Sequence, residues 1–167
     1  MTKSTIPIKR SSALVQFSKD HHFALLLIWK VRQGLRFGIE SQRINNYIIF
    51  FFQNYLEEHF KEEEDLLFVH LDFNNASRTV AEQDHKTIRE IMEKIKSDPK
   101  NKTISTEFIN RLEKHIRFEE RELFNELQNT LSESELNIIA EKMETLHPEK
   151  KEDNWNDAFW VKPKISN

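Results

Sequence analysis

Hydrophobic residues recur at three- and four-residue steps along most of this chain, which is the spacing of one face of an α-helix. The first such stripe includes a histidine, and its members are Leu14, Phe17, His21, Ala24, Leu25, Ile28 and Leu35. Polar and helix-breaking residues divide the chain into five predicted helices, at residues 12–34, 39–71, 78–96, 103–129 and 132–146. No segment shows the strict alternation that is typical of a half-buried strand.

Long amphipathic helices with short connections predict an all-α fold, an antiparallel up-down-up-down four-helix bundle. The capping-box pattern of Ser132 and Glu135 predicts a short fifth C-terminal helix. We therefore expect a flexible N-terminus at residues 1–11, the bundle with its short helix at 12–146, and a C-terminal tail at 147–167. The tail contains Trp155, Phe159 and Trp160, which we expect to dock on the bundle.

The composition fits long helices and excludes several kinds of chemistry. The 167 residues include only two glycines and four prolines, and no cysteine, so disulfides, thiolate metal sites and cysteine nucleophiles are excluded. The net charge of −3 provides no basic surface for nucleic acid. The most apolar segments, 23–29 and 47–52, are too short to span a bilayer. We expect a cytoplasmic protein without nucleic-acid or membrane partners.

Several large apolar side chains fall outside the central stripes of the predicted helices. They are Phe23, Leu27, Trp29, Phe37 and Trp160. These residues are candidates to cover the core, to receive the tail, or to form the surface of a homodimer.

One ten-residue template, with acidic residues between apolar ones, occurs twice. HFKEEEDLLF spans residues 59–68 and HIRFEERELF spans residues 115–124. Each places a histidine and a glutamate four residues apart, on the apolar stripe of its helix: His59 with Glu63, and His115 with Glu119. A carboxylate that faces a core costs several kcal/mol unless a partner compensates it. The partner is either the imidazoles themselves or a bound cation.

The other two long helices each add an Asp-His dipeptide on the stripe, Asp20-His21 and Asp84-His85. Every helix of the predicted bundle therefore supplies one inward histidine, and alternate helices add a glutamate. Imidazole nitrogen with carboxylate oxygen suits iron, manganese or zinc, and this donor set suits two adjacent ions. A metal-free polar core is the alternative, and it is tolerable only when every buried group is satisfied.

These residues give the chain a resemblance to the hemerythrin-like, or HHE cation-binding, domain family. The matching motifs are DHHFALL at residues 20–26, HFKEEEDLLF at 59–68, DHKTI at 84–88 and HIRFEERELF at 115–124. The resemblance implies a four-helix bundle that holds a non-haem di-iron centre. It implies His21, His59, His85 and His115 as terminal ligands, and Glu63 and Glu119 as bridging carboxylates.

Two ligand positions have adjacent competitors. His22 lies about a quarter turn from the stripe, so helical geometry favours His21. Glu120 competes with Glu119, and the symmetry with the first template favours Glu119. We expect Glu62 and Glu64 to be solvated. The spacing leaves open whether Asp20 and Asp84 support the ligands or lie at the surface.

The sequence departs from the oxygen-carrying members that it resembles, which have a second histidine on the third helix. Here the residues four positions before and after His85 are Ala81 and Arg89, so the set is incomplete unless His22 or His70 is recruited. His70 lies near the end of its predicted helix, where we expect a surface residue. Three functions therefore remain: a protein that binds or senses oxygen, nitric oxide or peroxide; a di-iron enzyme that consumes peroxide or nitric oxide, or donates iron for iron–sulfur cluster repair; and a metal-free interaction bundle.

Overall fold

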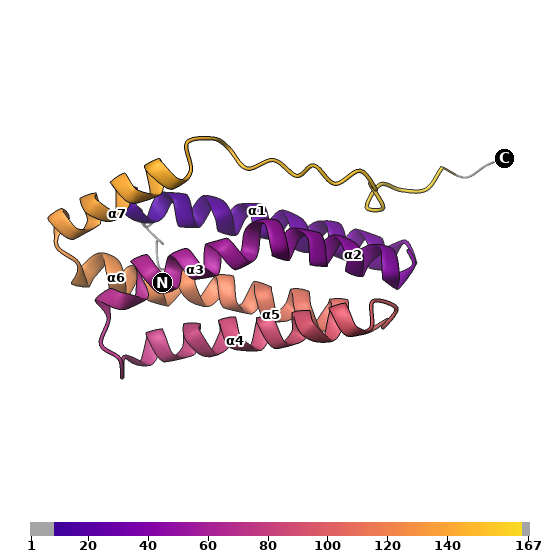
Figure 1. Cartoon of the computed structure of the whole chain (residues 1–167), viewed down its shortest axis with the longest axis horizontal. Helices are drawn as coiled ribbons and strands as arrows, with labels where there is room; N and C mark the ends of the chain where they lie inside the picture. The colour runs from indigo at the N-terminus through magenta and orange to yellow at the C-terminus, as the bar shows by residue number, and fades with distance from the viewer. Residues whose placement is uncertain (1–8, 165–167) are drawn as a thin grey trace, which may run out of the picture.

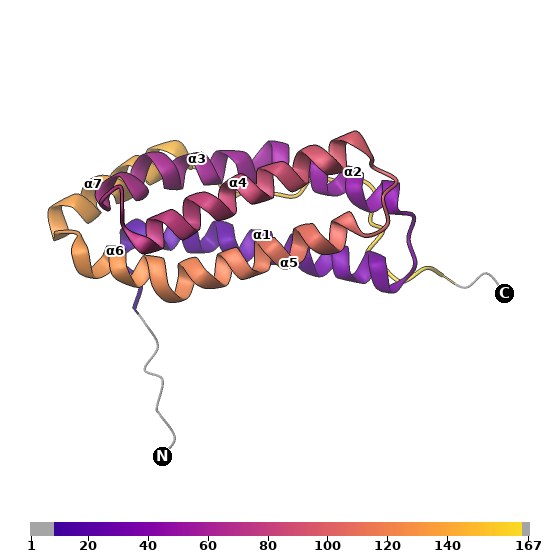
Figure 2. The ribbon, with the colours of Figure 1, turned by 90° about the horizontal axis from the view of Figure 1, so that it is seen from below.

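Four long helical segments lie side by side along the long axis of the molecule (Figures 1 and 2). A computed structural model describes residues 9–164 of the chain. The segments are α1 (Ser12–Arg36); α2 (Ser41–Phe51), a π-helical turn (Phe52–Leu56) and α3 (Glu57–Leu66); α4 (Ala76–Ser97); and α5 (Ile104–Phe118), a second π-helical turn (Glu119–Leu123) and α6 (Phe124–Thr130). A 3₁₀ turn (Phe68–His70) follows α3, and the shorter α7 (Glu133–Leu146) follows α6.

The arrangement is an all-helical bundle, as predicted, and the described residues contain no strand. The chain reverses direction between consecutive long segments, as the colour gradient shows (Figure 1). Helix α1 contacts both α2 and α5, and α4 contacts the same two helices. Helix α2 also contacts α5 across the bundle, so the interior is shared by all four long segments.

The turn between α1 and α2 is closed by two backbone hydrogen bonds around Gly38. The amide of Gly38 donates to Leu35 O at 3.1 Å, and the amide of Ile39 donates to Gly34 O at 3.0 Å. This pair of bonds is the Schellman motif, which requires a residue with left-handed backbone angles after the helix. Gly38 supplies it with a φ of 66°.

Two apolar clusters fill the bundle interior, one toward each end. One cluster contains Ile28, Tyr47, Phe51, Ile88, Met92, Phe108 and Leu112, among others. The other contains Leu14, Phe17, Leu67, Ala81, Leu123 and Phe124, among others. Along each long segment the predicted metal ligands fall between a member of one cluster and a member of the other, so a polar layer lies between two dry ones.

Helix α7 begins as the sequence predicts. The hydroxyl of Ser132 accepts a hydrogen bond from the amide of Glu135, and the Glu135 side chain accepts one from the amide of Ser132, which together form a capping box. After α7 the chain runs back along the length of the bundle as an extended tail (Figure 1).

The tail docks through its aromatic residues and through ion pairs. Phe159 is 2% exposed, and Trp155 and Trp160 pack against the same cluster. Asp153 pairs with Lys30 at 2.6 Å and accepts a hydrogen bond from the Tyr47 hydroxyl. The predicted docking of the tail aromatics is therefore confirmed.

We expect Gly34→Ala to dislodge the tail. A methyl group at Gly34 would lie 2.6 Å from Cδ2 of Phe159, which is too close for any real contact. Alanine would otherwise stabilise a helix interior by about 1 kcal/mol relative to glycine. The expected result is faster hydrogen exchange in the tail and a changed tryptophan fluorescence. Phe159→Ala should give the same change, and adding Gly34→Ala to it should cause little more; full additivity of the two changes would contradict this account.

The buried face of α1 differs from the predicted stripe at two leucines. Leu27, predicted to lie off the stripe, is fully buried, whereas Leu25, predicted on it, is 36% exposed. The reason is that the buried face of α1 follows Phe17, His21, Ala24, Ile28 and Val31.

Most of the predicted flexible N-terminus lies outside the described residues. None of the described helices is both long enough and apolar enough to cross a membrane.

Candidate metal centre

The structure brings together all six of the predicted metal ligands. His21 comes from α1, His59 and Glu63 from α3, His85 from α4, His115 from α5 and Glu119 from the first position of the second π-helical turn. Each of the six residues is at most 3% exposed. Four segments that are distant in the sequence therefore deliver their polar side chains to one buried layer.

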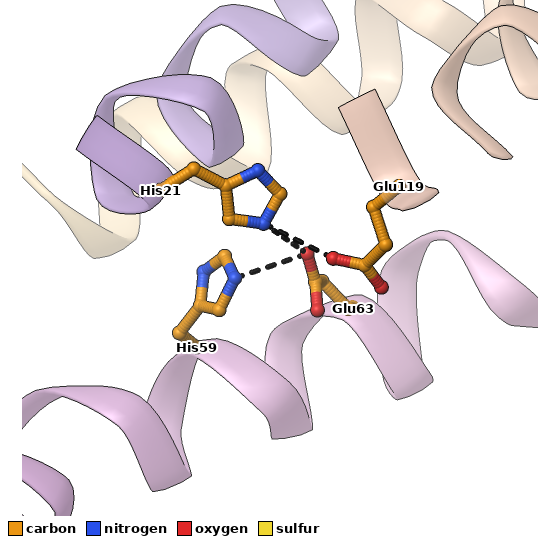
Figure 3. A group of neighbouring side chains, drawn as sticks. All are labelled: His21, His59, Glu63 and Glu119. Carbon is orange, nitrogen blue, oxygen red and sulfur yellow. Dashed lines mark ion pairs between the residues drawn. The ribbon is translucent and has the colours of Figure 1, made fainter. Parts of the chain in front are cut away.

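The six side chains form two groups that share both carboxylates. The first group is His21, His59, Glu63 and Glu119, and Figure 3 shows how the two rings face the two acids. The second group is His85 and His115 with the same Glu63 and Glu119. In each group the ligating atoms all lie within 4.8 Å of one another. Each group is thus a potential site for one ion, and the two sites are adjacent.

The shared carboxylate of Glu63 faces both groups. Its Oε1 lies 3.3 Å from Nε2 of His21 and 3.0 Å from Nε2 of His59, and its Oε2 lies 3.2 Å from Nε2 of His85. Two ligands at right angles, each about 2.1 Å from one ion, are separated by about 3.0 Å. These atoms are therefore spaced as ligands of common ions, with Glu63 placed between the two.

Glu119 makes equivalent contacts from the opposite helix. Its Oε2 lies 3.0 Å from Nε2 of His21 and 3.2 Å from Nε2 of His115, and its Oε1 lies 3.8 Å from Nε2 of His85. It also reaches histidines of both groups. The π-helical turn that begins at Glu119 has an i→i+5 hydrogen bond from the amide of Phe124 to Glu119 O. Such turns are rare and often occur at functional sites.

The inward atoms have no hydrogen-bond partner among the described residues. They are Nε2 of His21, His59, His85 and His115, and both carboxylate oxygens of Glu63 and Glu119. Buried polar atoms are almost always hydrogen-bonded, because each unsatisfied group costs about 1–3 kcal/mol. Eight such atoms converging on one layer would be costly as a metal-free core, but they fit the donor set of two metal ions.

A family comparison agrees with this geometry. The family model described as the hemerythrin HHE cation binding domain matches residues 15–127. The chain belongs to this hemerythrin family. No curated protein and no solved structure matches the chain. The matched residues include all six side chains of the buried layer.

In this hemerythrin domain each of the four inward histidines has an outer carboxylate beside its Nδ1. Glu120 lies 2.8 Å from Nδ1 of His21, and Glu64 lies 2.8 Å from Nδ1 of His85. A carboxylate that accepts the Nδ1 proton leaves the lone pair of Nε2 directed inward, and it fixes the orientation of the ring.

The outer carboxylates beside His59 and His115 are Asp20 and Asp84. Asp20 is hydrogen-bonded to Nδ1 of His59 at 3.2 Å, whereas Asp84 lies 3.5 Å from Nδ1 of His115, at ion-pair distance without a hydrogen bond. Both aspartates are buried, at 7% and 6% exposure, so they are not surface residues. The four contacts follow a cyclic order. Each long segment places a carboxylate beside the histidine of the next segment, and the last segment places one beside His21 of the first.

Each outer carboxylate is in turn paired with a cation. Arg10 pairs with Glu120 at 3.2 Å and Arg89 with Glu64 at 2.7 Å. Arg111 pairs with Asp84 at 2.6 Å and Lys151 of the tail with Asp20 at 3.3 Å. The outer charges are therefore balanced within the protein, while the two shared glutamates face only imidazoles.

Neighbouring carboxylates raise the pKa of the inward histidines His21 and His85. Burial lowers the pKa of His85, but the neighbouring Glu63, Glu64 and Glu119 outweigh burial and raise that pKa to about 9. The pKa of His21 is likewise depressed by burial and then raised well above its usual value by Glu119, Glu120 and Glu63. Because metal binds neutral imidazole, these histidines must release protons when a metal enters.

Aromatic rings border the site. The Phe60 ring stacks on His85 with 4.0 Å between centroids, and the Phe124 ring stacks on His21 with 5.2 Å between centroids. Phe68 also stacks on His85, at 5.4 Å. An apolar border limits the entry of water and strengthens the interactions between charged groups inside.

The structure separates the competitors that the sequence left open. His21 faces the buried layer whereas His22 is exposed. Glu119 faces the layer and Glu120 supports His21 from outside. His70 lies near Glu135 at 4.0 Å and is not part of either group. Metal ligation by the six residues itself stays a prediction.

The prediction that Glu62 is solvated is wrong. Glu62 is 8% exposed, and its Oε1 lies 2.6 Å from Nε2 of His147. Glu64 is only partly exposed and contacts His85. The contacts of Glu62, Glu64, Lys151 and Arg10 join segments that are distant in the sequence. The spacing of residues within one helix does not predict such contacts.

We expect Glu64→Ala to weaken metal binding by about 10–100-fold, the usual effect of removing an outer partner of a ligand histidine. His85 would lose the group that orients its ring. Glu57→Ala is the matched control, because Glu57 also pairs with Arg89, at 2.9 Å, but does not contact His85. Metal titration of both variants provides the measurement. Equal loss of affinity in the two variants would show that only the Arg89 pairing matters.

Proposed function

We propose that this protein holds two divalent metal ions, iron by preference, and binds a small ligand such as dioxygen, nitric oxide or peroxide at them. The observation that carries the proposal is the convergence of eight buried donor atoms without hydrogen-bond partners among the described residues. His21 and His59 would hold one ion, and His85 and His115 the other. Glu63 and Glu119 would bridge them. Manganese or zinc would fit the same donors.

The number of donors supports ligand binding at the metal. Two six-coordinate ions need about twelve coordination positions, and four imidazoles with two bridging carboxylates supply about eight. The remaining positions are available to water or to an added ligand. Two bound metal ions would supply electrons or Lewis acidity to that ligand. The protein would orient the ligating rings, exclude water and balance the outer charges.

The apolar surroundings favour a small ligand of little charge. Phe17, Phe60 and Phe124 lie beside the ligating rings, and each is fully buried. Charged substrates would lose their hydration without compensation in such surroundings. A diatomic molecule or peroxide would lose little. The site lacks the second histidine that oxygen carriers have four residues from the first one on the third helix. The two residues at that distance from His85 are Ala81, in an apolar cluster, and Arg89, paired with Glu57 and Glu64. Reversible oxygen carriage is therefore less well supported than sensing or reaction of the ligand.

Two measurements test the proposal. Elemental analysis of protein from iron-replete expression should give about two metal ions per chain. Less than about one ion per chain would favour a metal-free interaction bundle instead. Rapid mixing of the reduced protein with oxygen, nitric oxide or peroxide then separates the other two functions, because a stable adduct indicates binding or sensing and repeated consumption indicates an enzyme. A cytoplasmic location and a homodimer remain predictions.

A further inference from the structure

A second group of side chains that could ligate a metal lies outside the central layer, beside α3. It consists of Glu58 and Glu62, four residues apart on α3, and His147, the first residue after α7. Their ligating atoms all lie within 4.8 Å of one another. Glu62 is next to Glu63 in sequence, but its carboxylate contacts His147 rather than the central histidines.

An ion pair between Glu62 and His147 does not satisfy this group. Oε1 of Glu62 contacts Nε2 of His147, whereas Oε2 of the same carboxylate is buried and has no hydrogen-bond partner within residues 9–164. The nearby Lys151 ammonium is directed to Asp20, at 3.3 Å. Glu58 adds a second negative charge from the solvent side. The group therefore combines an unsatisfied buried oxygen with two carboxylates beside a single imidazole.

We propose that Glu58, Glu62 and His147 form an additional binding site for a divalent cation of the zinc or manganese class. Imidazole nitrogen and carboxylate oxygen are both ligands of zinc, and three protein ligands leave the fourth position to water. Tetrahedral ligands about 2.0 Å from zinc are about 3.3 Å apart, so His147 and Glu62 need only small movements from their 2.6 Å contact. The exposed Glu58 can rotate to close the site, and it leaves a path from solvent.

The cation would fasten the start of the tail to the bundle. His147 is the first residue after α7, and Lys151 lies four residues further along the tail. Lys151 pairs with the Asp20 carboxylate that supports His59. A cation at His147 would therefore hold in place a segment that contributes to the outer support of the central site. Cation binding at His147 does not require metal in the central site.

Zinc titration of the metal-free protein tests the site by counting ions. Wild type should bind about three zinc ions per chain, and Glu58→Gln and His147→Gln about two each. The matched controls, Glu107→Gln and His22→Gln, change exposed side chains and should keep wild-type stoichiometry. Zinc should also slow hydrogen exchange in residues 147–161 of wild type but not of Glu58→Gln. Because Glu58 is exposed, this substitution should not disturb the fold by itself.

A Glu63→Ala/Glu119→Ala background distinguishes failure here from failure at the central site. That variant should retain about one zinc ion, which the further change Glu58→Gln should remove. If the central site does not bind metal, wild type would bind about one zinc ion and Glu58→Gln none. Equal zinc stoichiometry in wild type, Glu58→Gln and His147→Gln would overturn the additional site, whatever the central site does.

Discussion

Glu63→Ala is expected to remove both metal ions from the central site, and Glu119→Ala to do the same. Each carboxylate lies between the two groups of histidines: Glu63 contacts His21, His59 and His85, and Glu119 contacts His21 and His115. Loss of either one therefore removes a donor from both ions at once. It also leaves two adjacent divalent ions with less negative charge between them. Elemental analysis after iron-replete expression, with spectroscopy of the iron centre, would show the loss.

Both variants should remain folded, because the side chains that stabilise the bundle lie elsewhere. The two apolar clusters flank the polar layer and do not include Glu63 or Glu119. The removed carboxylates are buried without hydrogen-bond partners among the described residues, so their loss also ends a desolvation cost. Far-ultraviolet circular dichroism and thermal unfolding test this point, and exposed Glu107→Ala is the control. Wild-type metal content in both bridging variants would refute the assignment.

The helices could be predicted closely from periodicity and breakers. The first predicted helix, 12–34, corresponds to Ser12–Arg36, and the last, 132–146, corresponds to Glu133–Leu146. The two π-helical turns were not predicted. Each replaces an i→i+4 bond by an i→i+5 bond, for example from the amide of Glu57 to Phe52 O, and hydrophobic spacing alone does not distinguish these patterns.

The inward residues of the central site were predictable because they repeat. The His-x-x-x-Glu spacing places both side chains on one helix face, and the chain shows it twice on apolar stripes. The outer residues were not predictable in the same way. Asp20 supports His59, 39 residues away, and Glu120 supports His21, 99 residues away. Such pairs depend on which helices become neighbours, which the spacing within one helix does not encode.

The cyclic order of the outer carboxylates explains why the two halves of the sequence share a pattern. Both Asp-His dipeptides use the histidine inward and the aspartate toward the following segment, as Asp20 does with His59. Both Glu-Glu dipeptides use the first carboxylate inward and the second toward another segment, as Glu64 does with His85. Adjacent residues on a helix point about 100° apart, so each dipeptide serves two neighbouring positions in the bundle.

His21→Ala is expected to reduce the metal content from about two ions per chain to about one, whereas His22→Ala is expected to leave it unchanged. The two histidines are adjacent, but only His21 faces the shared carboxylates, with Nε2 at 3.0 Å from Glu119 and 3.3 Å from Glu63. His59 alone would then remain as the terminal donor of the first ion. The second ion would keep His85 and His115 together with both carboxylates.

This adjacent pair provides a matched test, because the two variants make the same chemical change one residue apart on α1. His22 is exposed, and its removal creates no cavity, whereas His21 is 2% exposed and stacks on Phe124. Some loss of stability is therefore expected in His21→Ala alone, and His21→Gln separates that loss from the loss of a ligand because it retains most of the side-chain volume. Metal analysis of all three variants decides the question. Greater metal loss in His22→Ala than in His21→Ala would exchange their roles and would require α1 to be rotated about its axis.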